Sequence, residues 1–149
     1  MSTIHSYEVD IKWLKERKGF MTSPELLSGV EIATPPQFPK GIEGIWSPEH
    51  LFTAAVSSCL MTTFLAIAEN SKLEFTSFEV KSKGVLEQVE GKYLITEVQL
   101  FPALEIVHEH DRERAERIII KSEAACLISN SIKSKVTCQP AITVPKAVV

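Results

Sequence analysis

The chain has 149 residues, of which 44% are hydrophobic and 23% are charged. This composition is typical of one folded globular domain and excludes an intrinsically disordered chain. The formal net charge is -3, and the lysines and arginines are scattered along the chain, so we expect no nucleic-acid partner.

Residues 4–33 predict a small antiparallel sheet. Apolar residues largely alternate over residues 4–14, which is typical of a half-buried strand. Residues 15–19 form a charged turn, and two further strands are expected, one from Phe20 and one near residues 28–33.

The first eight residues lack the basic and apolar regions of a signal peptide. Three cysteines are also too few for a secreted disulfide framework. We therefore expect a cytoplasmic protein whose thiols are reduced.

Residues 34–47 predict an irregular loop, because they contain three prolines and two glycines. A helix is expected to follow at residues 48–70. Ser47 can cap it, Pro48 suits its first position, and Glu49 favours the positive end of the helix dipole.

The predicted helix is almost wholly apolar. Residues 51–68 carry no charge, which reaches the length of a membrane span. Five hydroxyl side chains interrupt this run, and no second such run exists. We therefore expect a buried central helix and no membrane.

The second half of the chain predicts a long hairpin, a helix and a strand. The hairpin occupies residues 74–107 and turns at Glu90 and Gly91. The helix is expected at residues 111–128 and the final strand at residues 135–144.

This order of elements predicts an α+β fold rather than a wound βαβ sheet. We expect one domain, residues 1–149, since neither part beside the loop is large enough to stand alone. A single chain offers little material to cover an apolar helix on most sides, so a partner subunit is expected to supply the cover.

Two cysteines lie inside the two predicted helices. Cys59 ends the segment of residues 47–59, and Cys126 lies in the segment of residues 123–131. A thiolate attacks a peroxide and becomes a sulfenic acid, which a second cysteine can convert to a disulfide. A cysteine on an apolar helix is also commonly an inert small hydrophobe, the role expected for Cys138 in the final strand.

These two segments, in this order, resemble the two cysteine motifs of the OsmC/Ohr family, the osmotically inducible and organic hydroperoxide resistance proteins. The resemblance spans roughly residues 5–144 and implies an intertwined homodimer with antiparallel sheets packed around two central helices. It also implies a stress-response thiol peroxidase in which Cys59 is peroxidatic and Cys126 resolving. An external dithiol, such as a dihydrolipoyl group on a carrier protein, would reopen the disulfide.

The same resemblance implies two further catalytic residues. Glu49 matches the glutamate that orients the family's catalytic arginine, for which Arg17 in the charged turn is our assignment and Lys18 the alternative. Ten helical residues span about 15 Å, too far for Glu49 to reach Cys59 along its own helix. If both serve one site, Arg17 or a second chain must join them.

Organic peroxides are the favoured substrates, because Trp46 and Phe52 would give the pocket beside Cys59 an apolar wall. Two other functions stay open on the same scaffold. One is a non-enzymatic protein that binds a small ligand, and the other is a thiol redox sensor, which would be oxidised without sustained turnover.

No cofactor or metal is expected to be bound. The chain has no glycine-rich phosphate loop and no dinucleotide fingerprint. His108 and His110 flank Glu109, but no further ligands follow at a diagnostic spacing, so this cluster is expected to be a solvated corner.

Overall fold

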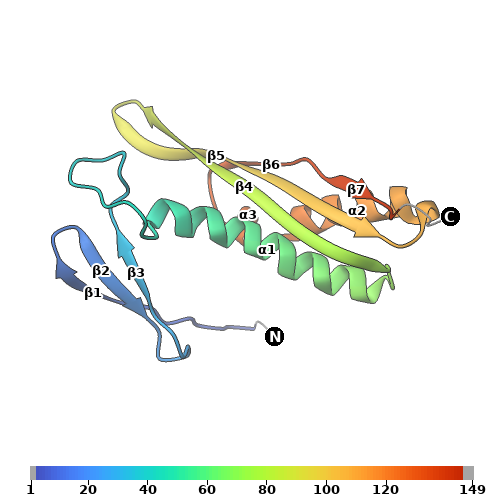
Figure 1. Ribbon diagram of the computed structural model, residues 1–149, viewed down its shortest axis with the longest axis horizontal. Coiled ribbons are helices and arrows are strands. Elements are labelled where there is room, and N and C mark those ends of the chain that lie inside the picture. Colours follow the sequence, from blue (N-terminus) through green and yellow to red (C-terminus); the bar gives the residue numbers. More distant parts are fainter. Residues whose placement is uncertain (1–2, 146–149) are drawn as a thin grey trace. The chain divides into compact units, whose positions relative to one another are not determined.

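The computed structural model describes residues 3–145. The chain divides into two compact units, with the boundary between Leu51 and Phe52. The first unit holds strands β1 to β3 and the second holds most of the helical residues and the long hairpin (Figure 1). Together they give the predicted α+β fold class.

The first unit is built on a three-stranded antiparallel sheet in the order β1-β2-β3. The strands are β1 (Asp10–Lys15), β2 (Lys18–Thr22) and β3 (Val30–Ala33). The β1–β2 turn places Glu16 in the left-handed region, at φ 51°, and the Trp13 indole donates a 2.9 Å hydrogen bond to the Glu16 carbonyl. The expectation of a strand from residue 4 is wrong, since β1 begins at Asp10.

The alternation of apolar residues predicted a half-buried strand, but β1 is exposed in the single chain. All six of its residues are exposed, and Trp13 is 73% exposed. Alternation shows that a strand has one apolar face, but not whether its own chain supplies the layer that covers it. The described residues of this chain do not supply a layer that covers β1.

Helix α1 (Pro48–Asn70) begins and ends where the sequence predicts. Ser47 is fully buried, and its hydroxyl accepts a 3.1 Å hydrogen bond from the His50 backbone N–H. This contact satisfies one of the unpaired N–H groups at the helix start. The preceding loop is held to the sheet by a 2.8 Å hydrogen bond from the Ala33 N–H to the Trp46 carbonyl.

The second unit contains a long hairpin of β4 (Phe75–Val89) and β5 (Lys92–Ile106). Its turn residues Glu90 and Gly91 have φ of 50° and 80°, the pair of positive angles that a tight hairpin turn requires. The turn predicted from the sequence therefore lies at these two residues.

The sheet of the second unit is mixed, which corrects the expectation of antiparallel sheets throughout. Two short strands, β6 (Lys135–Cys138) and β7 (Ala141–Thr143), pair with β5 in parallel. The chain returns to β5 through helices, and such a crossover produces parallel pairing. The single final strand expected at residues 135–144 is divided, because Pro140 has no N–H to donate to the ladder.

The second helix is also divided. In place of one helix at residues 111–128, the chain forms a 3-10 turn η1 (Glu109–Asp111), α2 (Arg112–Ala125) and α3 (Leu127–Asn130). Between α2 and α3, Cys126 has an extended backbone with φ -64° and ψ 117°. Cys126 therefore sits at a helix end rather than inside a helix.

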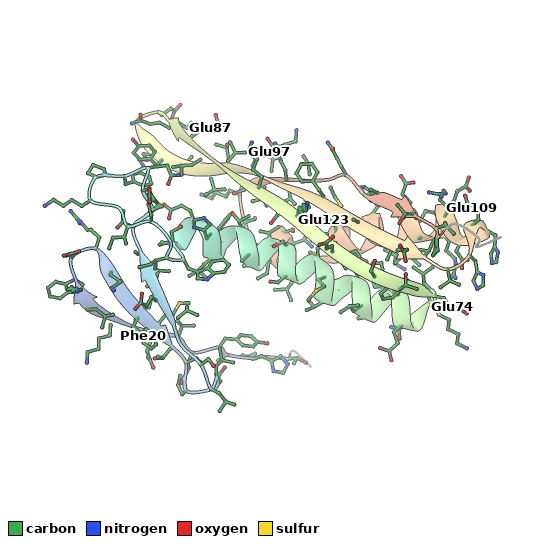
Figure 2. The ribbon with its side chains drawn as sticks, in the orientation of Figure 1. Phe20, Glu74, Glu87, Glu97, Glu109 and Glu123 are labelled. Carbon is green, nitrogen blue, oxygen red and sulfur yellow. The ribbon has the colours of Figure 1, made fainter. Side chains whose placement is uncertain are left out.

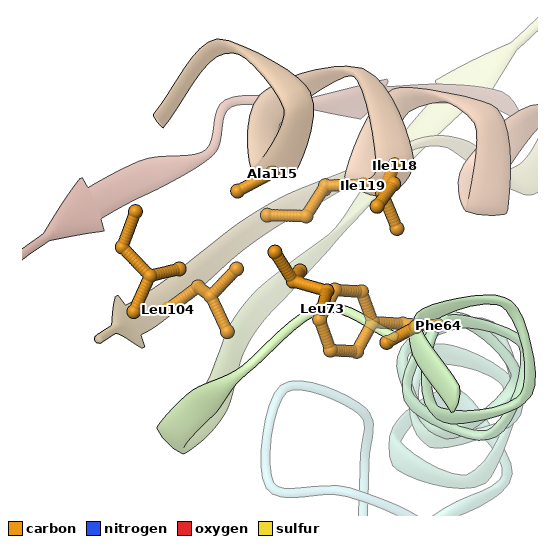
Figure 3. Packing of buried hydrophobic residues seen from close by; sticks show 8 residues of the cluster. Phe64, Leu73, Leu104, Ala115, Ile118 and Ile119 are labelled. Atoms are coloured by element: carbon orange, nitrogen blue, oxygen red, sulfur yellow. The ribbon is translucent and has the colours of Figure 1, made fainter. Parts of the chain in front are cut away.

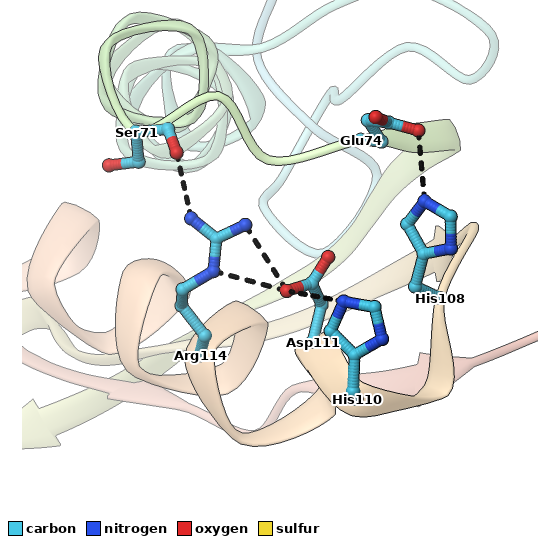
Figure 4. Close-up of polar contacts among 6 residues, drawn as sticks. All are labelled: Ser71, Glu74, His108, His110, Asp111 and Arg114. Carbon is cyan, nitrogen blue, oxygen red and sulfur yellow. Dashed lines mark hydrogen bonds and ion pairs between the residues drawn. The ribbon is translucent and has the colours of Figure 1, made fainter.

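A polar cluster fixes the start of α2 (Figure 4). Arg114 donates a 3.2 Å hydrogen bond to the largely buried Asp111 carboxylate and a 2.7 Å hydrogen bond to the Ser71 carbonyl just after α1. His108 contacts Glu74 at 3.2 Å. These bonds tie the end of α1 to the start of α2, and the two histidines lie in this solvated corner.

The largest core cluster joins α1, β5 and α2 around Phe64 (Figure 3). The Phe64 ring stacks on Phe78 with centroids 4.2 Å apart and meets the edge of Phe75 at 5.3 Å. Gly84 of β4 faces Thr53 so closely that a Cβ at this glycine would clash with the threonine hydroxyl. Its missing side chain lets α1 lie close to the hairpin.

Helix α1 is buried on one face only in the single chain, which leaves the other face for the partner subunit that the sequence predicts as its cover. By length and composition this helix could cross a membrane, and 28% of its most apolar 18-residue stretch is buried. A core helix of a soluble protein passes the same test. The exposed face carries no charge from residue 51 to residue 68.

Candidate functional site

Cys59 and Cys126 share one buried hydrophobic cluster in the second unit. Both are free thiols, and Cys126 is fully buried. The cluster joins α1 and β5 to the end of α2, and its buried members are Val56, Cys59, Leu60, Val98, Leu100 and Cys126. Two thiols 67 residues apart in the sequence thus meet in the fold.

The two thiols lie in one cluster, and one hydroxyl lies beside them. Cys59 and the Thr63 hydroxyl both influence the pKa of Cys126, Cys59 raising it and Thr63 lowering it. That hydroxyl lies 4.0 Å from the Cys59 sulfur. Sequence reasoning did not single out Thr63, although its position four residues after Cys59 puts both on one helix face.

The end of α2 places Cys126 against α1. Its N–H donates a 3.1 Å hydrogen bond to the Glu123 carbonyl, and its carbonyl accepts a 3.0 Å hydrogen bond from Asn130. The extended backbone of Cys126 breaks the helix, while bonds on both sides hold the residue in place. The position of its sulfur is therefore fixed by the junction of α2 and α3.

Burial, which is the largest cause, the nearby Glu123 carboxylate and Cys59 together raise the pKa of the Cys126 thiol to about 12. Burial and Glu123 likewise raise the pKa of Cys138 to about 11. Cys138 packs against the same cluster. Cys126 is therefore held as a thiol at neutral pH.

A pH dependence of stability follows from the Cys126 thiol. The ordinary pKa is 9.0 and the folded value is about 12, so the unfolded chain releases this proton at lower pH than the folded chain. The contribution to stability is fully present below pH 9 and is lost as pH rises toward 12. Urea unfolding of the reduced protein below and above pH 9 should show this decline.

Cys126→Ala is the control for that measurement. It should show a shallower decline of the unfolding free energy above pH 9, with the part due to Cys138 retained. An equal decline in the variant would contradict the assignment to Cys126.

Arg17 and Glu49 line one pocket, which lies within the first unit and has a volume of about 770 Å³. Apolar side chains from the three strands and the following loop form most of its wall, among them Ile11, Trp13 and Met21. One Glu49 carboxylate oxygen is buried. The two residues assigned to tune the thiolate are thus brought to the same pocket.

The other predicted residues of the first unit are placed differently. Lys18 lines the same pocket, but its ammonium pairs with Glu31 at 3.7 Å across β2 and β3. Trp46 lines a separate pocket, where it meets the His50 ring edge to face at 6.1 Å. In the second unit, Phe52 packs against the cysteine cluster.

The histidine corner does not gather a metal-ligand set. The rings of His108 and His110 stack with centroids 5.1 Å apart. Within residues 3–145, no group of three or more histidine, cysteine, aspartate or glutamate side chains comes together to hold an ion.

A family model identifies the protein family of this chain. The model described as OsmC-like protein matches residues 41–140, which is more than half of the chain. The chain belongs to the OsmC-like family. The matched region includes Glu49, Cys59 and Cys126, whereas Arg17 precedes it.

Individual relatives of this OsmC-like protein are distant in sequence. The uncharacterized protein YmaD of Bacillus subtilis (strain 168) is 24% identical over 143 residues, which is 91% of each chain. An OsmC-like protein of unknown function from Vibrio cholerae has a TM-score of 0.83 at 22% identity, over 92% of this chain and 99% of that one. An organic hydroperoxide resistance protein from Elizabethkingia anophelis, with thiocyanate bound, has a TM-score of 0.76 at 22% identity, over 97% and 100%. At these low sequence identities, the structural likeness establishes the fold that this chain shares with them and nothing further.

Proposed function

We propose that this OsmC-like protein is a thiol-dependent peroxidase that reduces organic hydroperoxides through Cys59 and Cys126. The observation that carries the proposal is that the two thiols lie in one buried cluster. Membership of the family and likeness to an organic hydroperoxide resistance protein support a peroxide-related stress protein.

The environments of the two thiols support different roles for them. The raised pKa of Cys126 keeps it protonated, and a protonated thiol is a poor nucleophile. Cys126 is therefore suited to the resolving role, in which it reacts only after Cys59 has been oxidised. This leaves Cys59 as the thiol that attacks the peroxide.

The proposed cycle has three steps. The Cys59 thiolate attacks one peroxide oxygen, the O–O bond breaks, and the alkoxide leaves and takes a proton to become an alcohol. The Cys126 sulfur then attacks the Cys59 sulfenic acid, so that the S–S bond forms and the hydroxyl leaves as water. An external dithiol, for which a dihydrolipoyl group is the proposed source, returns two electrons and restores both thiols.

Arg17 and Glu49 are the proposed activating residues. A guanidinium favours a thiolate and the developing negative charge of the leaving oxygen, and a carboxylate can orient it. Their common pocket supports this pairing. Because Lys18 is already paired with Glu31, Arg17 is the better candidate of the two cations.

The apolar wall of that pocket supports organic peroxides over hydrogen peroxide. Alkyl groups gain free energy when they leave water for apolar surroundings, whereas hydrogen peroxide has no apolar surface to bury. Trp46 and Phe52 remain proposed contacts for the alkyl part.

A homodimer is proposed as the working assembly, in the cytoplasm. The exposed face of α1 is uncharged over several turns and includes Met61 and Leu65. Large exposed apolar patches are typical of interfaces between proteins. The exposed apolar residues of β1 support the same proposal.

Leu65→Glu is expected to shift this protein from dimer to monomer, because it places a charge on the uncharged face of α1. Sedimentation velocity should give twice the chain mass of 16.6 kDa for the wild type and a single chain mass for the variant. Ile120→Glu is the control, since Ile120 is equally exposed but lies on α2 among charged residues. A monomeric wild type would contradict the dimer.

The peroxidase proposal is tested by turnover. Reduced wild-type protein should consume cumene hydroperoxide for many cycles with dihydrolipoamide as reductant, and faster than it consumes hydrogen peroxide. Peptide mapping of the oxidised protein should find a Cys59–Cys126 disulfide. Oxidation that stops after one equivalent would favour a redox sensor, and no oxidation would favour a ligand-binding role.

A further inference from the structure

We propose that Thr63 is a positioning residue for the attacking thiol, and that its hydroxyl donates a hydrogen bond to the Cys59 thiolate. This inference rests on the proposed thiol cycle, but it names a residue to which that cycle gives no part. Thr63 follows Cys59 by four residues on α1, so both side chains lie on one face of the helix. The Thr63 hydroxyl lies 4.0 Å from the Cys59 sulfur.

The other hydroxyls of α1 near Cys59 bond to the helix backbone. Ser57, Ser58 and Thr62 each donate a hydrogen bond of 3.2 or 3.3 Å to a carbonyl three or four residues earlier. This is an ordinary arrangement for a hydroxyl inside a helix. Thr63 differs from them, because the neighbour of its hydroxyl is the Cys59 sulfur. A hydroxyl placed beside a thiol is in position to donate to it when it ionises.

The contact of 4.0 Å joins a hydroxyl and a neutral thiol, and we expect it to shorten when the thiol ionises. A thiolate accepts hydrogen bonds and has no proton to donate, so the hydroxyl is then the donor. Hydrogen bonds to a charged acceptor are shorter and stronger than neutral ones. Cys59 is only 9% exposed and Thr63 is half-buried. An anion with so little access to water depends on donors within the protein.

The titratable groups of this cluster do not supply such a donor. Burial and the charge of Glu123, which Figure 2 labels on α2, raise the pKa values of Cys126 and Cys138 to about 12 and about 11. Thiols are weak donors, and a negative charge opposes the ionisation of a neighbouring thiol. The other members of the cluster are apolar. Thr63 is therefore the hydroxyl donor that the fold places beside the attacking sulfur.

The proposed bond acts on the first step of the cycle. Donation to the thiolate favours the ionised form of Cys59 over the neutral thiol, so a larger fraction of the chains is ready to attack the peroxide. Because Thr63 and Cys59 belong to the same helix, the helix itself fixes the geometry of this bond. The bond adds to the positive charge that Arg17 is proposed to supply.

The test compares Thr63→Val with Thr62→Val, a matched control that removes the neighbouring hydroxyl and keeps the branched side chain. Both are made with Cys126→Ala and Cys138→Ser, so that Cys59 is the one thiol in the chain. The ultraviolet absorbance of the thiolate then follows the ionisation of Cys59 with pH, and a protein with Cys59→Ser in addition is the blank. The ionisation midpoint should rise by about one pH unit in Thr63→Val and stay unchanged in Thr62→Val.

A second arm measures the reaction with peroxide. Below both midpoints, Thr63→Val in the protein with three cysteines should form the Cys59 sulfenate about threefold more slowly. A tenfold smaller thiolate fraction is then partly offset by the higher reactivity of a more basic thiolate. Above both midpoints the variant should equal or exceed the wild-type rate. A general packing defect would slow the reaction at every pH.

Thr63→Ser separates the hydroxyl from the methyl group. It keeps the donor and should return most of the ionisation midpoint to the wild-type value. The proposal is overturned if the midpoint is unchanged in Thr63→Val, if it shifts equally in Thr62→Val, or if Thr63→Ser shifts it as far as Thr63→Val.

The two arms separate this proposal from the peroxidase proposal. A shifted midpoint in Thr63→Val, together with a wild type that forms no sulfenate, would defeat the peroxidase proposal and leave the role of Thr63 standing. Sustained peroxide turnover by the wild type, with the same midpoint in Thr63→Val, would defeat the role of Thr63 alone.

Discussion

Cys59→Ser is expected to abolish peroxide turnover, with a loss of at least about 10³ in rate. A serine hydroxyl is not ionised at neutral pH and cannot replace the thiolate that attacks the O–O bond. Cys126→Ser should behave differently, because Cys59 can still be oxidised once. It should consume about one equivalent of peroxide per chain and then stop with Cys59 as the sulfenic acid.

Steady-state turnover of cumene hydroperoxide and mass spectrometry of the oxidised proteins measure these outcomes. Cys138→Ser is the matched control, since it removes a third thiol beside the same cluster and should retain turnover. Sustained turnover by Cys59→Ser would contradict the assigned role, and loss in Cys138→Ser alone would transfer the resolving role to Cys138.

Phe64→Ala is expected to lower the free energy of unfolding by about 3–5 kcal/mol. Phe64 is fully buried between α1, β5 and α2, and it stacks on Phe78 at 4.2 Å. Its removal loses both the burial of the ring and the aromatic contacts, and it leaves a cavity that three packed elements cannot close. This is the largest stability effect expected from a single apolar truncation here.

Urea unfolding at several protein concentrations measures this change, because a dimer would make apparent stability depend on concentration. Leu94→Ala is the control, since Leu94 is 48% exposed on β5 and should cost no more than about 1 kcal/mol. A loss for Phe64→Ala as small as for Leu94→Ala would contradict the assigned core.

The cysteine helix was predictable because its signals are local. Ser47 caps the helix, Pro48 suits its first turn, and the uncharged run sets its length, so the sequence predicts bounds that agree with Pro48–Asn70. The hairpin turn at Glu90 and Gly91 was predictable for the same reason, since a tight turn needs positive φ angles at adjacent residues. Burial was less predictable, since the exposed faces of β1 and α1 depend on which chain covers them.

The break at Cys126 and the parallel pairing of β6 and β7 could not be read from the sequence. Helical spacing continues through residues 125 and 126, so the pattern gives no sign that Cys126 is extended. Strand orientation depends on the crossover through α2 and α3, which is a long-range property. Thr63 and Glu123 were missed because each becomes noteworthy only through its neighbours in the fold.

The sequence by itself determined the α+β order of elements, the bounds of α1 and the two cysteines that the OsmC-like motifs single out. The tertiary structure decided that Cys59 and Cys126 share one buried cluster, that the Thr63 hydroxyl lies 4.0 Å from the Cys59 sulfur, and that the Glu123 charge helps to raise the pKa of Cys126. Helix caps and turns are fixed by backbone hydrogen bonds and φ angles within a few residues. The thiol environment is fixed by packing between α1 and the end of α2, where burial and a neighbouring charge together set the chemistry.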